Sequence, residues 1–175
     1  MPKLIIISGP MGSGKSTTAK LLAQQLTEPN YYLQMDNLKW SLHGLNEDLK
    51  KTYQLVYEIS YSIIDTCLKN NVSVIVEKVV NAEEFKHLIS IGDKYEVEVL
   101  PVLLKIELQN TIQRVTQRRQ KDSLDTTLDY LDKVNKSFTV TQKLFNLDPR
   151  QLIIDSYSAT TSEIVAEIIN NLKTN

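Results

Sequence analysis

Short runs of apolar residues, rich in β-branched side chains, recur along the chain and are bounded by turn-forming residues. Runs of this length and composition are typical of buried strands. Five strands are expected, at residues 3–8, 31–35, 72–77, 97–104 and 151–155. Because Pro101 lies inside the fourth run and lacks a backbone N–H, we expect that strand to begin at or after Pro101, or to be bulged there.

Segments with helical spacing separate these runs. The clearest one ends near Asn70, and its apolar face is marked by residues three or four positions apart: Leu49, Tyr53, Val56, Ser60, Ile63 and Cys67. Further helices are expected at residues 15–26, 108–119, 126–146 and 162–172. Strands that alternate with helices predict an α/β fold in which a parallel sheet is covered on both faces.

Length, charge and cysteine content narrow the class of protein. The chain has 175 residues and a formal charge of −1, so we expect a single domain over residues 1–175 and no long nucleic acid as partner. The lone Cys67 excludes an intramolecular disulfide and a cysteine-based metal site. The apolar runs are far shorter than the roughly 18 residues of a membrane span, and the first run does not lead to a cleavage site. We therefore expect a cytoplasmic protein without a membrane partner.

Glycine is concentrated at one place, because three of the five glycines fall between Gly9 and Gly14. The segment reads Gly9-Pro10-Met11-Gly12-Ser13-Gly14-Lys15-Ser16-Thr17 and matches the phosphate-binding motif G-x-x-x-x-G-K-[ST]. A predicted strand precedes it and a predicted helix follows it, which is the context that gives this motif its meaning. Glycines let backbone N–H groups turn toward a phosphate, and the helix N-terminus adds further donors.

The motif assigns roles to its residues. We expect Lys15 to contact the β and γ phosphates of ATP and the Ser16 hydroxyl to bind Mg²⁺. The other residues of the expected ATP site in this loop are Gly9, Met11, Gly12, Ser13, Gly14 and Thr17.

Other nucleotide-binding classes fit less well. The dinucleotide fingerprint needs a third glycine or alanine, whereas Gly12 and Gly14 are followed at that position by Thr17. The sequence has neither the D-x-x-G and N-K-x-D motifs of GTPases nor the LSGGQ signature of transporters. We also expect the chain to be too short for an AAA+ module with its separate lid domain.

On this motif and the strand–helix order, the chain resembles the small P-loop kinases, which include shikimate and gluconate kinases, chloramphenicol phosphotransferase, the kinase part of polynucleotide kinase and the zeta-toxin kinases. The resemblance implies a three-layer P-loop NTPase fold with a five-stranded, mainly parallel sheet. It also implies an ATP-dependent phosphotransferase that moves the γ-phosphoryl group of ATP·Mg to a hydroxyl of a small-molecule or nucleotide-type acceptor. A nucleotide-binding regulator or slow ATPase without an acceptor is the alternative.

Two carboxylates follow predicted strands where the family places its acceptor and metal groups. Asp36 follows the second strand and would face the acceptor hydroxyl, with a helix N-cap or turn as its structural alternative. Glu77 ends the third strand, where the family commonly has Asp followed by Gly. It would orient Mg²⁺-bound water or hold the substrate, and an exposed Glu77-Lys78 pair is the alternative.

Arginines after the fourth strand resemble the helix-to-lid segment of the family. The match places Arg114 near the adenine of ATP and Arg118 over the transferred phosphoryl group, with Arg119 as the competing lid residue. The lid segment is expected around residues 117–127. A guanidinium brought in by a closing lid neutralises charge that develops on the phosphoryl oxygens. A solvated helix end is the simpler interpretation of the same arginines.

The histidines and aromatic residues have weaker functional signals in the sequence. His43 and His87 have no partner at ligand spacing, so both are expected to be structural. Trp40 and His43 follow Asp36 and are candidates to line the acceptor pocket. The tyrosines at four-residue intervals are expected to belong to the core: Tyr53, Tyr57 and Tyr61.

Overall fold

The computed structural model describes residues 1–44 and 49–174. The described residues contain one five-stranded sheet with the order β2-β3-β1-β4-β5, in which every adjacent pair is parallel. The strands are β1 (Lys3–Ser8), β2 (Asn30–Gln34), β3 (Ser73–Glu77), β4 (Glu98–Lys105) and β5 (Leu152–Asp155). All five expected strands are therefore confirmed, with their ends shifted by one residue at most.

The expectation for Pro101 was wrong, because β4 begins before Pro101 and runs through it. The ladder between β4 and β5 begins only at Val102, so β5 does not yet flank β4 at Pro101. On its other side, Pro101 lies opposite Ile6 of β1. Proline is tolerated where one side of a strand has no neighbouring strand.

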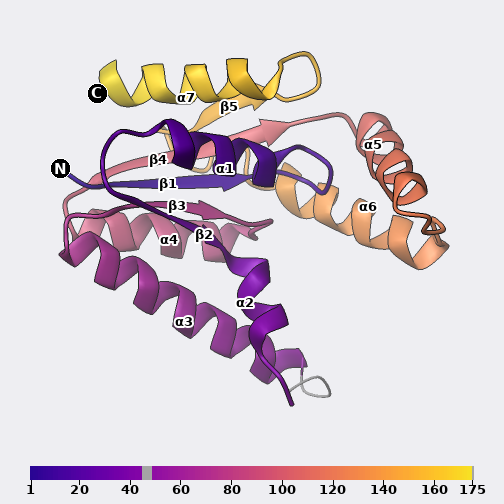
Figure 1. Cartoon of the computed structure of the whole chain (residues 1–175), viewed down its shortest axis with the longest axis horizontal. Helices are drawn as coiled ribbons and strands as arrows, with labels where there is room; N and C mark the ends of the chain where they lie inside the picture. The colour runs from indigo at the N-terminus through magenta and orange to yellow at the C-terminus, as the bar shows by residue number, and fades with distance from the viewer. Residues whose placement is uncertain (45–48, 175) are drawn as a thin grey trace.

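Helices cover both faces of the sheet and give three layers (Figure 1). They are α1 (Lys15–Gln25), α2 (Met35–Ser41), α3 (Leu49–Lys69), α4 (Ala82–Lys94), α5 (Leu108–Lys121), α6 (Leu128–Gln142) and α7 (Thr161–Thr174). In Figure 1, α1 and α7 lie together on one face and α3 and α4 on the other, whereas α5 lies beyond the carboxyl ends of the strands. The expected fold class, with a parallel sheet between two helical layers, is confirmed.

Alternation along β1 builds a core on each side of the sheet. Leu4 and Ile6 belong to the cluster shared with α3 and α4, and Ile5 and Ile7 belong to the cluster shared with α1 and α7. All four side chains are buried. A strand that is buried on both faces explains why the first apolar run is continuous rather than alternating.

Two helices were missed from the sequence, α2 and α4. The start of α4 carries a capping box, in which Asn81 accepts a hydrogen bond from the Glu84 N–H and the Glu84 side chain accepts one from the Asn81 N–H. Its apolar residues Phe85, Leu88 and Ile89 follow the helical spacing and are buried. These signals were available in the sequence. The helix expected at 126–146 is shorter, since α6 ends at Gln142.

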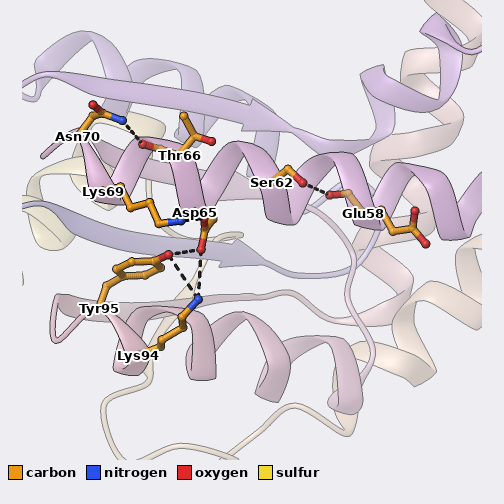
Figure 2. A network of polar contacts seen from close by, with 8 residues as sticks. All are labelled: Glu58, Ser62, Asp65, Thr66, Lys69, Asn70, Lys94 and Tyr95. Carbon is orange, nitrogen blue, oxygen red and sulfur yellow. Dashed lines mark hydrogen bonds and ion pairs between the residues drawn. The ribbon is translucent and has the colours of Figure 1, made fainter.

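A polar network ties α3 to the end of α4 (Figure 2). Asp65 accepts hydrogen bonds from Lys69 at 2.6 Å, from Lys94 at 3.3 Å and from the Tyr95 hydroxyl. The hydrogen bonds from Lys69 and Tyr95 hold the pKa of Asp65 well below its usual value. The network links the ends of α3 and α4, which pack on the same core cluster.

No helix among the described residues is long and apolar enough to cross a membrane.

Candidate functional site

The phosphate-binding loop joins β1 to α1 in the tight geometry that its glycines permit. A Cβ on Gly9 would lie 2.7 Å from the Leu104 carbonyl oxygen, closer than such contacts allow. Gly14 is the N-cap of α1 and has a φ of 90°, a left-handed conformation that favours glycine. The Ser13 N–H donates to the Pro10 carbonyl at 3.2 Å and closes the loop.

Lys15 begins α1 and lies within the loop, with only 8% of its surface exposed. Its Nζ donates a hydrogen bond to the Pro10 carbonyl at 2.9 Å. Burial lowers the pKa of Lys15, and the negative charges of Glu77 and Asp36 oppose that shift. A cationic side chain is thus held between the loop and two acidic residues from neighbouring strand ends.

A cleft of about 370 Å³ brings most of the sequence-predicted residues together. Those that line it are Met11, Gly12, Gly14, Lys15, Ser16, Thr17, Asp36, Glu77, Arg114 and Arg118. Gly9, Ser13 and Arg119 are not among its lining residues. Residues from β2–α2, β3 and α5 therefore meet at the loop, although they are far apart in the sequence.

Glu77 and Lys78 are both buried, at 4% and 7% exposure, so the interpretation of the pair as an exposed surface was wrong. Burial raises the pKa of Glu77, while the Lys15 charge and hydrogen bonds from Ser16 and Tyr32 lower it. The same environment raises the pKa of Tyr32 to about 12, mainly through burial and then through the charge of Glu77. Glu77 therefore lies against the side chain that the motif assigns to Mg²⁺.

Asp36 is the second residue of α2, and its side chain is exposed toward the cleft. The N-cap of α2 is Gln34, so the interpretation of Asp36 as an N-cap was wrong. An acid in the first turn of a helix is favoured by the helix dipole. Because the Asp36 side chain is exposed, its carboxylate is accessible to a ligand.

The three candidate arginines have different surroundings. Arg114 is half-buried, and it donates to the Ser156 carbonyl at 2.9 Å and to the Gly12 carbonyl at 3.5 Å. Arg119 donates from Nε to the Asp125 carbonyl at 2.8 Å and lies over the Tyr130 ring, 4.2 Å from its centroid. Arg118 is exposed and lines the cleft. Arg119 thus contacts the turn between α5 and α6, whereas Arg118 faces the cleft.

Some residues of the site could not be recognised from the sequence. Ser137 of α6 accepts a hydrogen bond from the Met11 N–H at 3.1 Å, across 126 positions of sequence. Gln34 and Tyr130 also line the cleft. Lys78 lies behind it and donates to the Tyr57 hydroxyl at 2.6 Å. No local sequence signal marks contacts of this kind, because they depend on how helices pack on the sheet.

The histidines and aromatic residues partly fit their expected roles. The centroid of the His87 ring lies 4.4 Å from the centroid of the Tyr61 ring, and His87 does not line the cleft. Trp40 is 72% exposed on α2, and neither it nor His43 lines the cleft. Tyr57 and Tyr61 pack against the core as expected, but Tyr53 is 39% exposed. Among residues 1–44 and 49–174, no group of three or more His, Cys, Asp or Glu side chains is arranged to hold a metal.

Comparison with known proteins gives a family match. The family model described as "AAA domain" matches residues 4–141 of this chain, from β1 almost to the end of α6. A protein of Methanococcus aeolicus named "Probable thymidylate kinase" is 25% identical over 191 aligned residues, which cover 98% of this chain and 96% of that protein.

Solved structures of small kinases share the fold. The APS kinase of Mycobacterium tuberculosis in complex with AMPPNP and APS superposes with a TM-score of 0.68 at 18% identity, covering 98% of each chain. A gluconokinase from Sinorhizobium meliloti 1021 gives a TM-score of 0.67 at 16% identity and covers 99% of this chain and 93% of its own. These likenesses confirm the expected three-layer fold and the resemblance to small P-loop kinases.

Proposed function

Since the chain belongs to the family described as "AAA domain" and has the fold of P-loop kinases, we propose that it transfers the γ-phosphoryl group of ATP to a hydroxyl of a small-molecule or nucleotide-type acceptor. The observation that carries this proposal is the cleft in which Lys15 and Ser16 lie with Asp36, Glu77 and Arg118. A phosphate-binding loop alone fits many nucleotide-binding proteins. The additional carboxylates and arginine supply groups for a second substrate and for the transferred phosphoryl group.

On the ATP side, the loop amides and Lys15 hold the phosphates. Lys15 exchanges its hydrogen bond to Pro10 for the β and γ phosphates, whose negative charge stabilises a buried ammonium. Arg114 borders the loop at the Gly12 carbonyl and lies 5.5 Å from the Tyr157 ring centroid, a position that suits contact with the adenosine part.

The donor set of the cleft fits Mg²⁺. The Ser16 hydroxyl and the Glu77 carboxylate are oxygen ligands, which Mg²⁺ prefers, and they line one space. Mg²⁺ commonly binds through one or two carboxylates together with substrate phosphates, so a complete protein cage is not required. When bound, Mg²⁺ neutralises charge on the phosphates.

On the acceptor side, Asp36 accepts the hydroxyl proton as the oxygen bonds to the γ-phosphorus and the bond to the ADP oxygen breaks. Its exposure at the cleft leaves it accessible to an acceptor. Positioning of the two oxygens in line is the main task of the protein in such a transfer, and the carboxylate supplies the proton acceptor.

The lid in this proposal is the segment around residues 117–127, within a single domain over residues 1–175. It contains the end of α5 and the turn that follows. Arg118 is the lid arginine, because Arg119 already bonds the Asp125 carbonyl and stacks on Tyr130. Closure brings Arg118 onto the phosphoryl oxygens and excludes water from the cleft.

A screen for ADP release tests the proposal. The purified chain is incubated with ATP·Mg and a panel of sugars, nucleosides and nucleoside monophosphates, including thymidylate because of the named relative. Stimulation by one acceptor, lost in Lys15→Ala, supports a kinase. Uniformly slow ADP release with every acceptor supports the alternative, a regulator or slow ATPase, and would overturn the proposal.

A further inference from the structure

Helix α2 has an outer face that begins inside the cleft and continues beyond it. Leu38 packs against the core on the inner side of this helix, whereas Asp36, Lys39 and Trp40 lie on the opposite side. Asp36 lines the cleft, and Trp40 is 72% exposed. Since α2 leads away from the carboxyl end of β2 (Figure 1), the Trp40 end of this face lies outside the cleft.

Asp36 and Trp40 are one helical turn apart. Residues at positions i and i+4 lie on the same face of a helix, one above the other. A rise of 1.5 Å per residue separates them by about 6 Å along the helix axis. An acceptor whose hydroxyl lies at Asp36 therefore has Trp40 within reach of the part that projects from the cleft.

A cation and a second aromatic ring lie beside Trp40. The Lys39 Nζ is 5.4 Å from the centroid of the Trp40 ring and 4.7 Å from the centroid of the Tyr53 ring in α3. It also donates a hydrogen bond to the Tyr53 hydroxyl at 3.0 Å. Such contacts between an ammonium and aromatic rings are attractive, so they restrain the indole while most of its surface stays exposed. A restrained ring loses less entropy when a ligand binds to it.

This combination of groups suits a nucleobase. Every base has a π-face that stacks on an aromatic side chain. The Lys39 ammonium is a hydrogen-bond donor, and the carbonyl oxygens of bases are acceptors. In a nucleoside, the ribose ring separates the base from the 5′-hydroxyl by a span comparable to one helical turn. A free sugar has no π-face to stack on the indole.

We propose that Trp40 is a stacking platform for the base of a nucleoside acceptor whose 5′-hydroxyl lies at Asp36. The substrate class is then a nucleoside rather than a free sugar or a simple alcohol. Trp40 contacts the unreacting end of this acceptor, outside the space that holds the phosphates. The assignment rests on the proposed function, because it assumes that Asp36 receives the acceptor hydroxyl.

An exposed tryptophan without a ligand predicts different behaviour. Single exposed apolar residues are common on protein surfaces. If Trp40 were one of these, nucleosides and free sugars would have the same effect on its ring, and its removal would not change nucleoside binding. Because Trp40 is the only tryptophan in the chain, intrinsic fluorescence reports on this one ring without any turnover.

The experiment measures quenching of Trp40 fluorescence in the whole chain. Inorganic tripolyphosphate·Mg fills the phosphate-binding loop without adding a second base. The probes are matched pairs with and without a base: uridine and adenosine with ribose, and thymidine with 2-deoxyribose. We expect saturable quenching by at least one nucleoside and none by its sugar. Quenching by no nucleoside, or equal quenching by the sugar, overturns the inference.

Variants connect the quenching to affinity, which calorimetry measures with the nucleoside that quenches most. Trp40→Leu should weaken its binding about tenfold or more, because the base loses its stacking partner. Trp40→Phe keeps a ring and should retain most of the affinity. Since Trp40 is largely exposed, both variants are expected to keep the stability of the wild type. Tyr31→Leu is the matched control, because Tyr31 is also an exposed aromatic residue but does not line the cleft and lies on β2.

Equal nucleoside affinity in Trp40→Leu and the wild type would also overturn the inference. The proposed kinase function fails in a different way. If nucleosides quench Trp40 but no acceptor stimulates ADP release in the screen above, the base site stands and the kinase function is overturned.

Discussion

The Met11 amide in the phosphate-binding loop donates a hydrogen bond to Ser137 Oγ, 3.1 Å away in α6. The same hydroxyl donates to the Val134 carbonyl at 2.8 Å, so it is fixed on its own helix. The helix that follows the proposed lid segment therefore braces the loop that is proposed to hold ATP. This contact gives the lid side of the cleft a direct influence on the shape of the loop.

Replacement of Ser137 by alanine should weaken nucleotide binding. The loss of one such hydrogen bond costs about 0.5–1.5 kcal/mol, so the dissociation constant for ATP should rise roughly two- to tenfold. Calorimetry with AMPPNP measures the change. Thr139→Ala is the matched control, because the exposed Thr139 hydroxyl donates to the Asn135 carbonyl of its own helix. Equal affinities in the two variants would contradict a brace.

Asp36→Asn should keep ATP affinity and lose transfer. The amide has the size of the carboxylate but cannot accept the hydroxyl proton, so kcat with the acceptor found in the screen should fall about 10²- to 10⁴-fold. Steady-state kinetics check the fall in kcat, and a nucleotide-binding titration checks that the affinity for ATP is unchanged. Asp132→Asn, on the exposed side of α6, serves as the control. Full activity in Asp36→Asn would remove the proton-acceptor role.

The two candidate lid arginines should separate by phenotype. Arg118→Ala should lower kcat about 10²- to 10³-fold and leave the thermal midpoint nearly unchanged, because Arg118 faces the cleft. Arg119→Ala should mainly lower the thermal midpoint, since it loses the Asp125 carbonyl and the Tyr130 ring. Rate and melting measurements on both variants test this. The reverse pattern would assign the lid role to Arg119.

Lys78 should give stability a measurable pH dependence. Its pKa is about 8 in the folded chain against an ordinary value of 10.5, so between these values the unfolded chain binds more protons. Stability attributable to Lys78 therefore rises as pH increases from about 8 to 10.5 and is constant below that window. The groups facing it are Asp36 of α2, Tyr57 of α3 and Glu84 of α4.

Urea unfolding of the wild type and Lys78→Met at several pH values isolates this contribution. The difference in the free energy of unfolding between the two should shift in favour of the wild type across the window. Parallel pH curves for the two proteins would show that Lys78 keeps an ordinary pKa in the folded state.

The phosphate-binding loop and the alternation of strands and helices along the chain could be predicted because their signals are local. A nine-residue segment from Gly9 to Thr17, placed after an apolar run, is sufficient to locate the loop. The start of α4 was also predictable in this way, because Asn81 and Glu84 form a capping box whose residues lie three positions apart in the sequence.

Other parts of the site depend on packing and could not be read from the sequence. Nothing near Lys78 in the sequence indicates that Tyr57, 21 positions earlier, will receive its hydrogen bond. Likewise, Arg118 and Arg119 are adjacent, and only the position of Tyr130 in α6 distinguishes their environments. Contacts of this kind become visible when the helices have been placed on the sheet.

The fate of the γ-phosphoryl group tests the central claim most directly. ATP labelled at the γ-phosphorus is incubated with the chain and with the acceptor that stimulates ADP release, and the labelled products are separated. The account predicts one labelled organic product formed in equal amount to ADP, and its loss in Asp36→Asn. Label recovered only as inorganic phosphate, with equal rates in the wild type and Asp36→Asn, would contradict phosphotransfer in this cleft.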